Sequence, residues 1–266
     1  MNEEYSENKN CKVVILAGGF GTRLKEETGS IPKPLVTIGG KPILWHIMKI
    51  YSKYGFNDFI IAGGYRVELI KNYFINFVLM NNDLKINLKD NRIDIISNNH
   101  EPFSVTVVDT GLNTLTGGRI KRLRKLIGNN RFMVTYGDGV ADINLNQLME
   151  FHKAQGKIAT VTGVRPSSRF GELNIKENLV TSFEEKPQVS DSYINGGFFI
   201  FEPSIFDYIE GDLTSLERAP LERLSREKNL TIYKHNGFWR CMDTFKDMEE
   251  LNNLWNNNQA KWKIWE

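Results

Sequence analysis

The stretch Val13-Val-Ile-Leu-Ala-Gly-Gly-Phe-Gly-Thr-Arg23 joins a run of apolar residues to a glycine-rich loop. Five consecutive apolar residues, ending at Ala17, are typical of a strand that is buried on both faces of a parallel sheet. Glycines in the loop let backbone N–H groups approach an anion, and successive amides form a concavity that fits a phosphate. The stretch therefore predicts an α/β protein with an anion-binding loop after its first strand.

The loop differs from the two commonest phosphate-binding motifs. A dinucleotide fingerprint, Gly-x-Gly-x-x-Gly, read from Gly19 needs a glycine where Leu24 stands. A Walker loop needs Lys-Ser or Lys-Thr after its last glycine, and Gly21 is followed by Thr22-Arg23. Neither motif fits, and a tight surface turn after the strand is the alternative to an anion-binding loop.

Apolar runs and segments of helical periodicity alternate along the rest of the chain. We expect strands at 59–62, 104–108, 132–135 and 158–164, and helices at 42–54, 67–79, 120–127 and 145–155. This alternation favours a mainly parallel sheet flanked by helices. A polar hairpin is expected at 85–97, and strand-like runs between 172 and 201 predict an antiparallel extension. Further helices are expected at 220–227 and 245–257.

Charge and cysteine content narrow the class of protein. Lys and Arg total 34 against 32 Asp and Glu, a net charge of +2, which gives no basic stripe for DNA or RNA. Cys11 and Cys241 belong to no CxxC pair, so neither a disulfide framework nor a structural zinc site is expected. No apolar run approaches the roughly 18 residues that span a bilayer. We expect a cytoplasmic protein with no nucleic-acid or membrane partner.

Lys33 stands out because it lies between Pro32 and Pro34, ten residues after Arg23. The flanking prolines restrict the backbone and bias it toward extended structure, so the lysine is held in place. A compact ammonium held in this way can neutralise charge that develops on a phosphate. An exposed loop is the competing interpretation of the Pro-Lys-Pro segment taken alone.

These residues belong to a longer series of motifs. The series comprises LAGGFGTRL, PKP, KPILWHIMK, VDTG, TGGR, TYGDGVAD, RFGEL, FEEKP, INGGFF, GFW and MDT, in this order along nearly the whole chain. It resembles the sugar nucleotidyltransferases, and WHIM, TYGDGVAD and GFWxxMDT resemble the glucose-1-phosphate cytidylyltransferases among them. The resemblance implies a Rossmann-like, mixed but mainly parallel α/β sheet and a reaction of CTP with glucose 1-phosphate.

The resemblance also implies a division of the chain and a homo-oligomer. A single nucleotidyltransferase domain would span 1–266, with a nucleotide-binding half at about 12–140. A sugar-phosphate half and the C-terminal helices would occupy 141–266. Mg²⁺ is the implied cofactor, with Asp138 and Asp243 as its ligands, and two carboxylates with substrate phosphate and water form a coordination set that Mg²⁺ accepts.

The resemblance assigns the remaining site residues by position. Arg23, Lys33 and Lys186 would be catalytic, and Gly171, Glu185 and Asn195 would bind the sugar. The implied nucleotide-binding residues are Leu16, Ala17, Gly18, Gly19, Phe20, Gly21, Thr22, Thr110, Gly111, Thr114, Gly117, Gly118, Arg119 and Gly137. Gly117 and Gly118 would allow close approach of base or ribose, and Arg119 would bring charge near the phosphates.

Two alternatives stay open. The first is the same reaction class with another nucleotide, such as UTP or dTTP, or with another sugar 1-phosphate. The second is a sugar-nucleotide-binding module without catalysis, which the joint presence of Arg23, Lys33, Asp138, Lys186 and Asp243 disfavours. The four histidines show no arrangement typical of nucleophilic catalysis, and we expect them to be structural.

Overall fold

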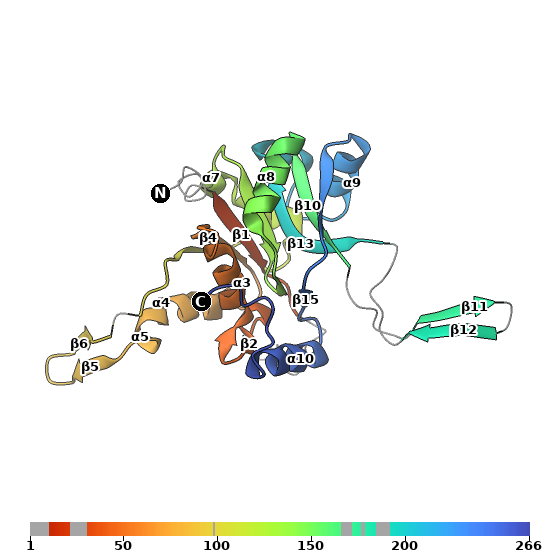
Figure 1. Cartoon of the computed structure of the whole chain (residues 1–266). Coiled ribbons are helices and arrows are strands. Elements are labelled where there is room, and N and C mark those ends of the chain that lie inside the picture. The colour runs from red at the N-terminus through yellow and green to blue at the C-terminus, as the bar shows by residue number, and fades with distance from the viewer. Residues whose placement is uncertain (1–10, 22–30, 98, 166–171, 177–178, 185–191) are drawn as a thin grey trace.

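The computed structural model describes residues 11–21, 31–97, 99–165, 172–176, 179–184 and 192–266. A seven-stranded sheet with the order β14-β10-β13-β8-β1-β4-β7 forms its centre (Figure 1). The strands are β1 (Lys12–Ala17), β4 (Asp58–Gly63), β7 (Ser104–Asp109), β8 (Phe132–Tyr136), β10 (Ala159–Val164), β13 (Ile194–Phe201) and β14 (Leu230–His235). All neighbouring strands are parallel except β13, which runs antiparallel to both β10 and β8.

The first strand, β1, lies inside the sheet, as its apolar run predicts. It pairs with β4 on one side and β8 on the other, so that Val13 stands between Phe59 and Met133. The side chains of Val13, Val14 and Ile15 are fully buried. Because the carboxyl ends of parallel strands share one edge, the loops after β1, β4 and β8 meet there.

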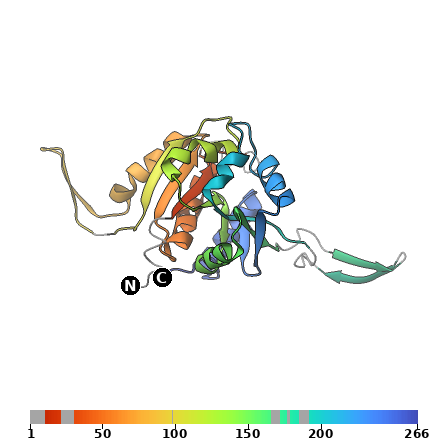
Figure 2. The same ribbon diagram turned by 90° about the horizontal axis from the view of Figure 1, so that it is seen from above.

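Helices cover both faces of the sheet (Figure 2), and each face has its own hydrophobic core. The first core receives side chains from α3 (Ile43–Ser52), α4 (Val67–Ile75), α8 (Leu145–Gln155) and α10 (Phe245–Asn256). The second receives them from α6 (Thr116–Arg122), α7 (Arg124–Ile127), the 3₁₀ helix η3 (Pro203–Tyr208) and α9 (Ala219–Arg226). These observations confirm the expected mainly parallel α/β sheet flanked by helices.

Three expected elements differ in their bounds or position. The helix expected at 120–127 begins at Thr116, and the helix expected at 67–79 divides at Asn76 into α4 and α5 (Phe77–Met80). The antiparallel strand β13 lies within the main sheet instead of extending it. Its two preceding strands, β11 (Glu172–Lys176) and β12 (Leu179–Glu184), pair only with each other among the described strands.

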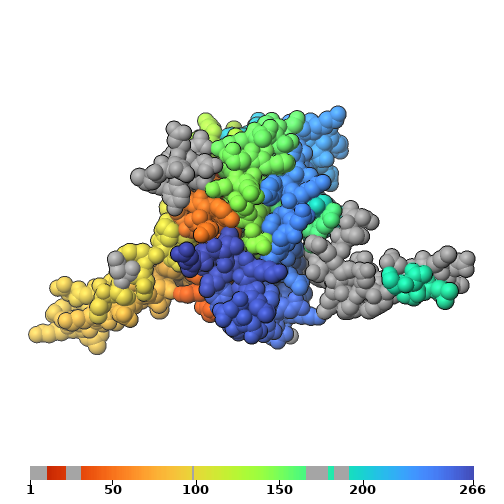
Figure 3. Space-filling view, viewed as in Figure 1, coloured from red at the N-terminus to blue at the C-terminus, as the bar shows by residue number. Residues whose placement is uncertain are grey.

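Short elements complete the described chain. They are the 3₁₀ helix η2 (Lys33–Leu35) and the paired strands β2 (Thr37–Ile38) with β3 (Lys41–Pro42), β5 (Leu84–Asn87) with β6 (Arg92–Ile95), and β9 (Gly139–Ala141) with β15 (Trp239–Cys241). The β5–β6 pair confirms the expected polar hairpin, and Asn91 in its turn has a φ of 52°. Residues 77–96, here called the arm, extend away from the body of the molecule (Figure 3).

The aromatic C-terminal tail packs into the first core. Trp262 is fully buried and its ring stacks on Phe238, with centroids 5.5 Å apart.

The imidazole of His46 on α3 is also fully buried, and its Nε2 atom lies 2.8 Å from the carbonyl oxygen of Ile38. Burial lowers the pKa of His46 to about 4, so this histidine is neutral at pH 7 and serves packing. Within the described part of the chain, no helix has the length and apolar character needed to cross a membrane.

Candidate active site

A cavity of about 570 Å³ opens at the carboxyl edge of the sheet, where the loops after β1 and β8 meet. This volume lies within the range of roughly 300 to 1,000 Å³ that holds small-molecule ligands. Its lining residues are Leu16, Ala17, Gly18, Gly19, Phe20, Gly21, Lys33, Pro34, Leu112, Asn113, Thr114, Leu115, Thr116, Arg119, Tyr136, Gly137, Asp138 and Asp243. The glycine-rich loop thus shares one cavity with the proline-flanked lysine and both aspartates.

Close backbone contacts fix the two loops that form the cavity floor. The N–H of Gly137 donates to the carbonyl oxygen of Leu16 at 3.0 Å. A Cβ atom at Gly137 would lie 2.9 Å from that oxygen and 3.1 Å from the Pro34 ring. Only glycine lets the end of β8 approach the end of β1 and η2 so closely.

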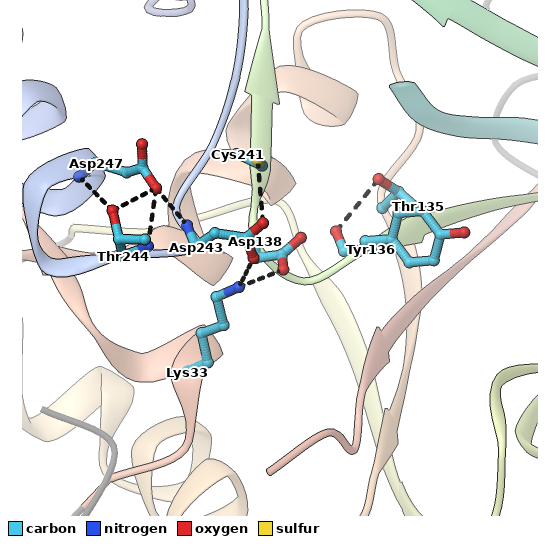
Figure 4. Close-up of polar contacts among 8 residues, drawn as sticks. All are labelled: Lys33, Thr135, Tyr136, Asp138, Cys241, Asp243, Thr244 and Asp247. Atoms are coloured by element: carbon cyan, nitrogen blue, oxygen red, sulfur yellow. Dashed lines mark hydrogen bonds and ion pairs between the residues drawn. The ribbon is translucent and has the colours of Figure 1, made fainter. Parts of the chain in front are cut away.

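Lys33 brings the two predicted metal ligands together (Figure 4). Its ammonium nitrogen lies 2.7 Å from Oδ2 of Asp138 and 2.7 Å from Oδ1 of Asp243. The three side chains come from η2, from the turn between β8 and β9, and from the turn before α10. One cation and two carboxylates therefore converge on a single point of the cavity wall.

Strand pairing positions the two aspartates. The short strands β9 and β15 pair so that Gly139 lies opposite Cys241, and the N–H of Met242 donates to the carbonyl oxygen of Asp138 at 2.8 Å. This pairing joins two segments that are about a hundred positions apart in the sequence.

The N-terminus of α10 holds Asp243 in place. An oxygen of Asp247 accepts hydrogen bonds from the backbone N–H groups of Asp243, at 3.1 Å, and Thr244, at 2.8 Å. The Thr244 hydroxyl accepts in turn from the N–H of Asp247 at 3.2 Å. This capping box satisfies amides at the start of the helix and fixes the residue before it.

The electrostatics of the cluster follow from burial and charge. Burial acts to lower the pKa of Lys33, but the carboxylates of Asp138 and Asp243 outweigh it and raise the pKa above its ordinary value. Burial, together with the same two carboxylates, raises the pKa of the neighbouring Cys241 thiol to about 12. The lysine is therefore charged and the cysteine is a neutral thiol at pH 7.

The two carboxylates also fit a divalent cation by their chemistry. Both direct an oxygen at the point where the Lys33 ammonium stands, and hard divalent cations bind carboxylate oxygens. No cluster of three or more His, Cys, Asp or Glu suited to a metal occurs among the residues that the structure describes. A cation held here would therefore need other ligands, which substrate phosphates and water commonly provide.

Arg119 lines the cavity, but its guanidinium is committed to the loops around it. It donates to the carbonyl oxygens of Gly18, Gly63, Gly111 and Leu112 at 2.8–3.3 Å, and to the Thr110 hydroxyl at 2.7 Å. A Cβ atom at Gly18 would lie 2.1 Å from the guanidinium carbon, and one at Gly64 would lie 2.4 Å from a guanidinium nitrogen. Arg119 thus joins the loops after β1, β4 and β7 into one unit.

The other residues of the 110–119 segment separate into two groups. Thr114 lines the cavity, whereas Thr110 is buried behind it and bonds Arg119. Gly117 and Gly118 lie in the first turn of α6 and do not line the cavity. A Cβ atom at Gly118 would lie 2.4 Å from the carbonyl oxygen of Asp212. The geometry gives these two glycines a packing role against residues 212–216.

Several cavity residues are absent from the set of site residues expected from the sequence. Thr116 and Tyr136 stand inside the TGGR and TYGDG motifs, and Leu112, Asn113 and Leu115 stand beside them. Asn195, an expected sugar ligand, lies next to the cavity wall, with its Nδ2 atom 3.1 Å from the Tyr136 hydroxyl. Five of the expected site residues lie outside the described residues: Thr22, Arg23, Gly171, Glu185 and Lys186.

Comparisons with known proteins show the family to which the chain belongs. Residues 12–259 match the family model described as Nucleotidyl transferase. The chain is 49% identical to the glucose-1-phosphate cytidylyltransferase of Salmonella typhimurium over 256 residues, which cover 96% of this chain and all of that protein. It is 46% identical to the probable glucose-1-phosphate cytidylyltransferase of Bacillus subtilis, over 96% of this chain and all of that protein.

Solved structures resemble the fold as well. The structure of HddC from Yersinia pseudotuberculosis superposes with a TM-score of 0.67 at 27% identity. The superposition covers 92% of this chain and 99% of that chain. The likeness therefore extends over most of the chain and is not limited to a fragment of it.

Proposed function

The chain belongs to the nucleotidyl transferase family, and from this premise we propose that it transfers the cytidylyl group of CTP to α-D-glucose 1-phosphate. An oxygen of the sugar phosphate attacks the α-phosphorus of CTP and forms a new P–O bond. The bond between the α-phosphorus and the bridging oxygen to the β-phosphate breaks, so pyrophosphate leaves opposite the nucleophile. The products are CDP-glucose and pyrophosphate.

The convergence of Lys33, Asp138 and Asp243 beside the glycine-rich loop is the observation that carries this proposal. Two anionic reactants repel each other, so a site that joins them must supply positive charge where their phosphates meet. Positioning and electrostatic stabilisation supply most of the rate in transfers of this kind. The cavity holds a charged ammonium and a pair of carboxylates suited to a cation at its wall, which meets this requirement.

The family resemblance assigns roles to individual residues. Lys33, together with Arg23, neutralises the triphosphate and the leaving pyrophosphate, and Lys186 orients the sugar phosphate. Gly171, Glu185 and Asn195 contact the sugar. Asp138 and Asp243 would hold Mg²⁺, which when bound would supply further positive charge to the phosphates.

A pyrophosphate-release screen tests the proposal. The purified protein is incubated with Mg²⁺, each of ATP, GTP, CTP, UTP and dTTP, and a panel of sugar 1-phosphates. We expect release to be fastest with CTP and glucose 1-phosphate. Fastest release with UTP or dTTP would preserve the reaction class and overturn the choice of base. No release from any pair would leave a sugar-nucleotide-binding module as the function.

We also propose that the single catalytic domain self-associates through its arm. Among its many polar residues, the arm exposes several large apolar side chains, including Met80, Leu88 and Ile96, which are 79%, 84% and 67% exposed. A two-stranded hairpin is marginally stable by itself, and a protruding one with exposed apolar side chains is stabilised when another surface covers them. Light scattering after size-exclusion chromatography should give a mass above the 30.6 kDa of one chain, and Leu88→Lys should shift it toward the monomer. A monomeric wild-type protein would refute this assembly.

A further inference from the structure

A chain of hydrogen bonds runs along the cavity wall through Glu217, a residue that no motif singles out. The hydroxyls of Thr116 and Ser215 each donate to Oε2 of Glu217 at 2.7 Å. The hydroxyl of Tyr136 donates to Oε1 at 2.7 Å. Both Thr116 and Tyr136 line the cavity, so one carboxylate holds two parts of its wall.

The single proton of the Tyr136 hydroxyl determines which groups donate and which accept in this network. A tyrosine hydroxyl has one proton, and Tyr136 gives it to Glu217, so its oxygen can only accept from the Nδ2 atom of Asn195 at 3.1 Å. The Oδ1 atom of Asn195 accepts from the N–H of Gly197 at 2.9 Å. The Asn195 amide therefore has one orientation, because Glu217 sets it from one side and the Gly197 amide from the other.

The Tyr136 ring is held as tightly as its hydroxyl. A Cβ atom at Gly197 would lie 2.5 Å from the ring, and Gly197 has a φ of 81°, so only glycine fits there. The ring also packs edge-on against Phe199, with centroids 5.9 Å apart. Tyr136 consequently has little freedom to compensate for a change at Glu217.

Glu217 is itself anchored on the nucleotide side of the cavity. The carbonyl oxygen of Asp212 accepts from the N–H of Leu115 at 2.8 Å, and that of Thr214 accepts from the N–H of Gly118 at 3.1 Å. The N–H of Leu216 donates to the Thr116 hydroxyl oxygen at 2.9 Å. The segment that bears Glu217 thus moves as one piece with the 115–118 segment.

The charged form of Glu217 suits this position. Desolvation acts to raise the pKa of Glu217, but the hydrogen bonds from Thr116, Ser215 and Tyr136 outweigh it and hold the pKa below its ordinary value. Near neutral pH the carboxylate can only accept hydrogen bonds, which keeps the three hydroxyls oriented as donors toward it.

From this network we infer that Glu217 is a positioning residue for the sugar phosphate. Through Tyr136 it orients the Asn195 amide, so that the remaining N–H of Asn195 is available as a donor to the sugar 1-phosphate. The inference rests on the proposed function, since it takes Asn195 as a contact of that substrate. It adds a residue whose effect reaches the substrate through two other side chains.

Glu217→Gln tests this orientation with almost no change of shape. The glutamine carbonyl can still accept from Thr116 and Ser215, and its NH₂ group then donates to Tyr136. Tyr136 would turn its proton toward Asn195, whose amide cannot reverse without losing the hydrogen bond from Gly197. We expect the KM for glucose 1-phosphate to rise about tenfold, the scale of one lost hydrogen bond to a charged group, and the KM for CTP to change less than about threefold.

A second variant shows whether the effect passes through the tyrosine. Tyr136→Phe removes the hydroxyl and should raise the same KM by a similar factor. In the Glu217→Gln/Tyr136→Phe double variant the two effects should not multiply, because each breaks the same connection. Glu222→Gln, on the exposed face of α9, is the matched control and should retain wild-type values.

The outcomes separate this inference from the proposed function. Wild-type protein that releases no pyrophosphate from CTP and glucose 1-phosphate would defeat the proposed function. With active wild-type protein, unchanged KM values in Glu217→Gln would overturn the role of Glu217. A lower melting temperature with equal effects on both substrates, or single-variant effects that multiply, would also overturn it, because they indicate general support of the fold.

Discussion

Replacing Lys33 by methionine tests the electrostatic centre of the site. The Lys33 nitrogen lies 2.7 Å from one oxygen of Asp138 and 2.7 Å from one oxygen of Asp243. Two distances of 2.7 Å to one nitrogen place these oxygens at most about 5.4 Å apart, where two charges repel by about 3 kcal/mol at an effective dielectric constant near 20. The carboxylates are 28% and 23% exposed, so water screens part of this repulsion. We expect Lys33→Met to lower the free energy of unfolding of the metal-free protein by about 2 kcal/mol.

The response to Mg²⁺ gives the sharper measurement. In the variant, a divalent cation bound by the two carboxylates relieves their repulsion, whereas in the wild-type protein it competes with the Lys33 ammonium. Thermal unfolding followed by circular dichroism, in EDTA and then in excess Mg²⁺, should show a larger increase of Tm for Lys33→Met than for the wild-type protein. The measurement needs no substrate and is independent of turnover.

Lys49→Met is the matched control for this experiment. Lys49 pairs with Glu101 at 2.9 Å, and the two side chains are 20% and 18% exposed, a burial similar to that of the Lys33 pairs. Its loss should destabilise the protein without any recovery on adding Mg²⁺. An equal response of the two variants to Mg²⁺ would refute the reasoning that Asp138 and Asp243 form a cation site.

Three further changes test other parts of the structure. Asp138→Ala should lower the rate of pyrophosphate release by at least about 100-fold and leave the far-ultraviolet circular dichroism unchanged; near-wild-type rates in saturating Mg²⁺ would contradict its role. The pKa of His46 is lowered from 6.5 to about 4, so the native state resists protonation. The free energy of unfolding should therefore fall by about 3 kcal/mol between pH 6.5 and 4, and this part of the fall should be absent in His46→Gln in urea titrations. Gly118→Ala places a methyl group 2.4 Å from the carbonyl oxygen of Asp212 and should cost about 2 kcal/mol of stability in urea unfolding; an unchanged midpoint would show that residues 212–216 yield easily.

Local sequence patterns predict most of the fold correctly. The helix at 145–155 has the expected bounds, and in the structure Asn144 is its N-cap and Gly156 its left-handed C-cap. The position of β13 could not be predicted, since pairing between strands distant in sequence has no local signature. The start of α6 at Thr116 was missed because Gly117 and Gly118 disfavour a helix, and contacts with residues 212–216 compensate for them.

Local motifs predict some of the site residues, whereas others can be found only from contacts between segments that are distant in the sequence. The glycine loop, Lys33, Asp138 and Asp243 carry strong local motifs, and the structure brings the described members into one cavity. Glu217 carries no such signal, because its role depends on hydrogen bonds to Thr116 and Tyr136, which lie 101 and 81 positions away from it in the chain. The sequence identifies the charged residues of the site more readily than those that orient them.

The position of Arg119 has a consequence for how the glycine loop meets a ligand. A trans peptide unit directs its N–H opposite its carbonyl, so each carbonyl held by the guanidinium turns the following N–H away from it. Gly18 and Leu112 are held in this way, and the residues after them, Gly19 and Asn113, line the cavity. The Arg119 guanidinium thus orients peptide groups in the two loops that line the cavity. Carbonyl groups held in this way have less freedom to reorient, so less reorganisation energy is lost when an anion binds to these loops.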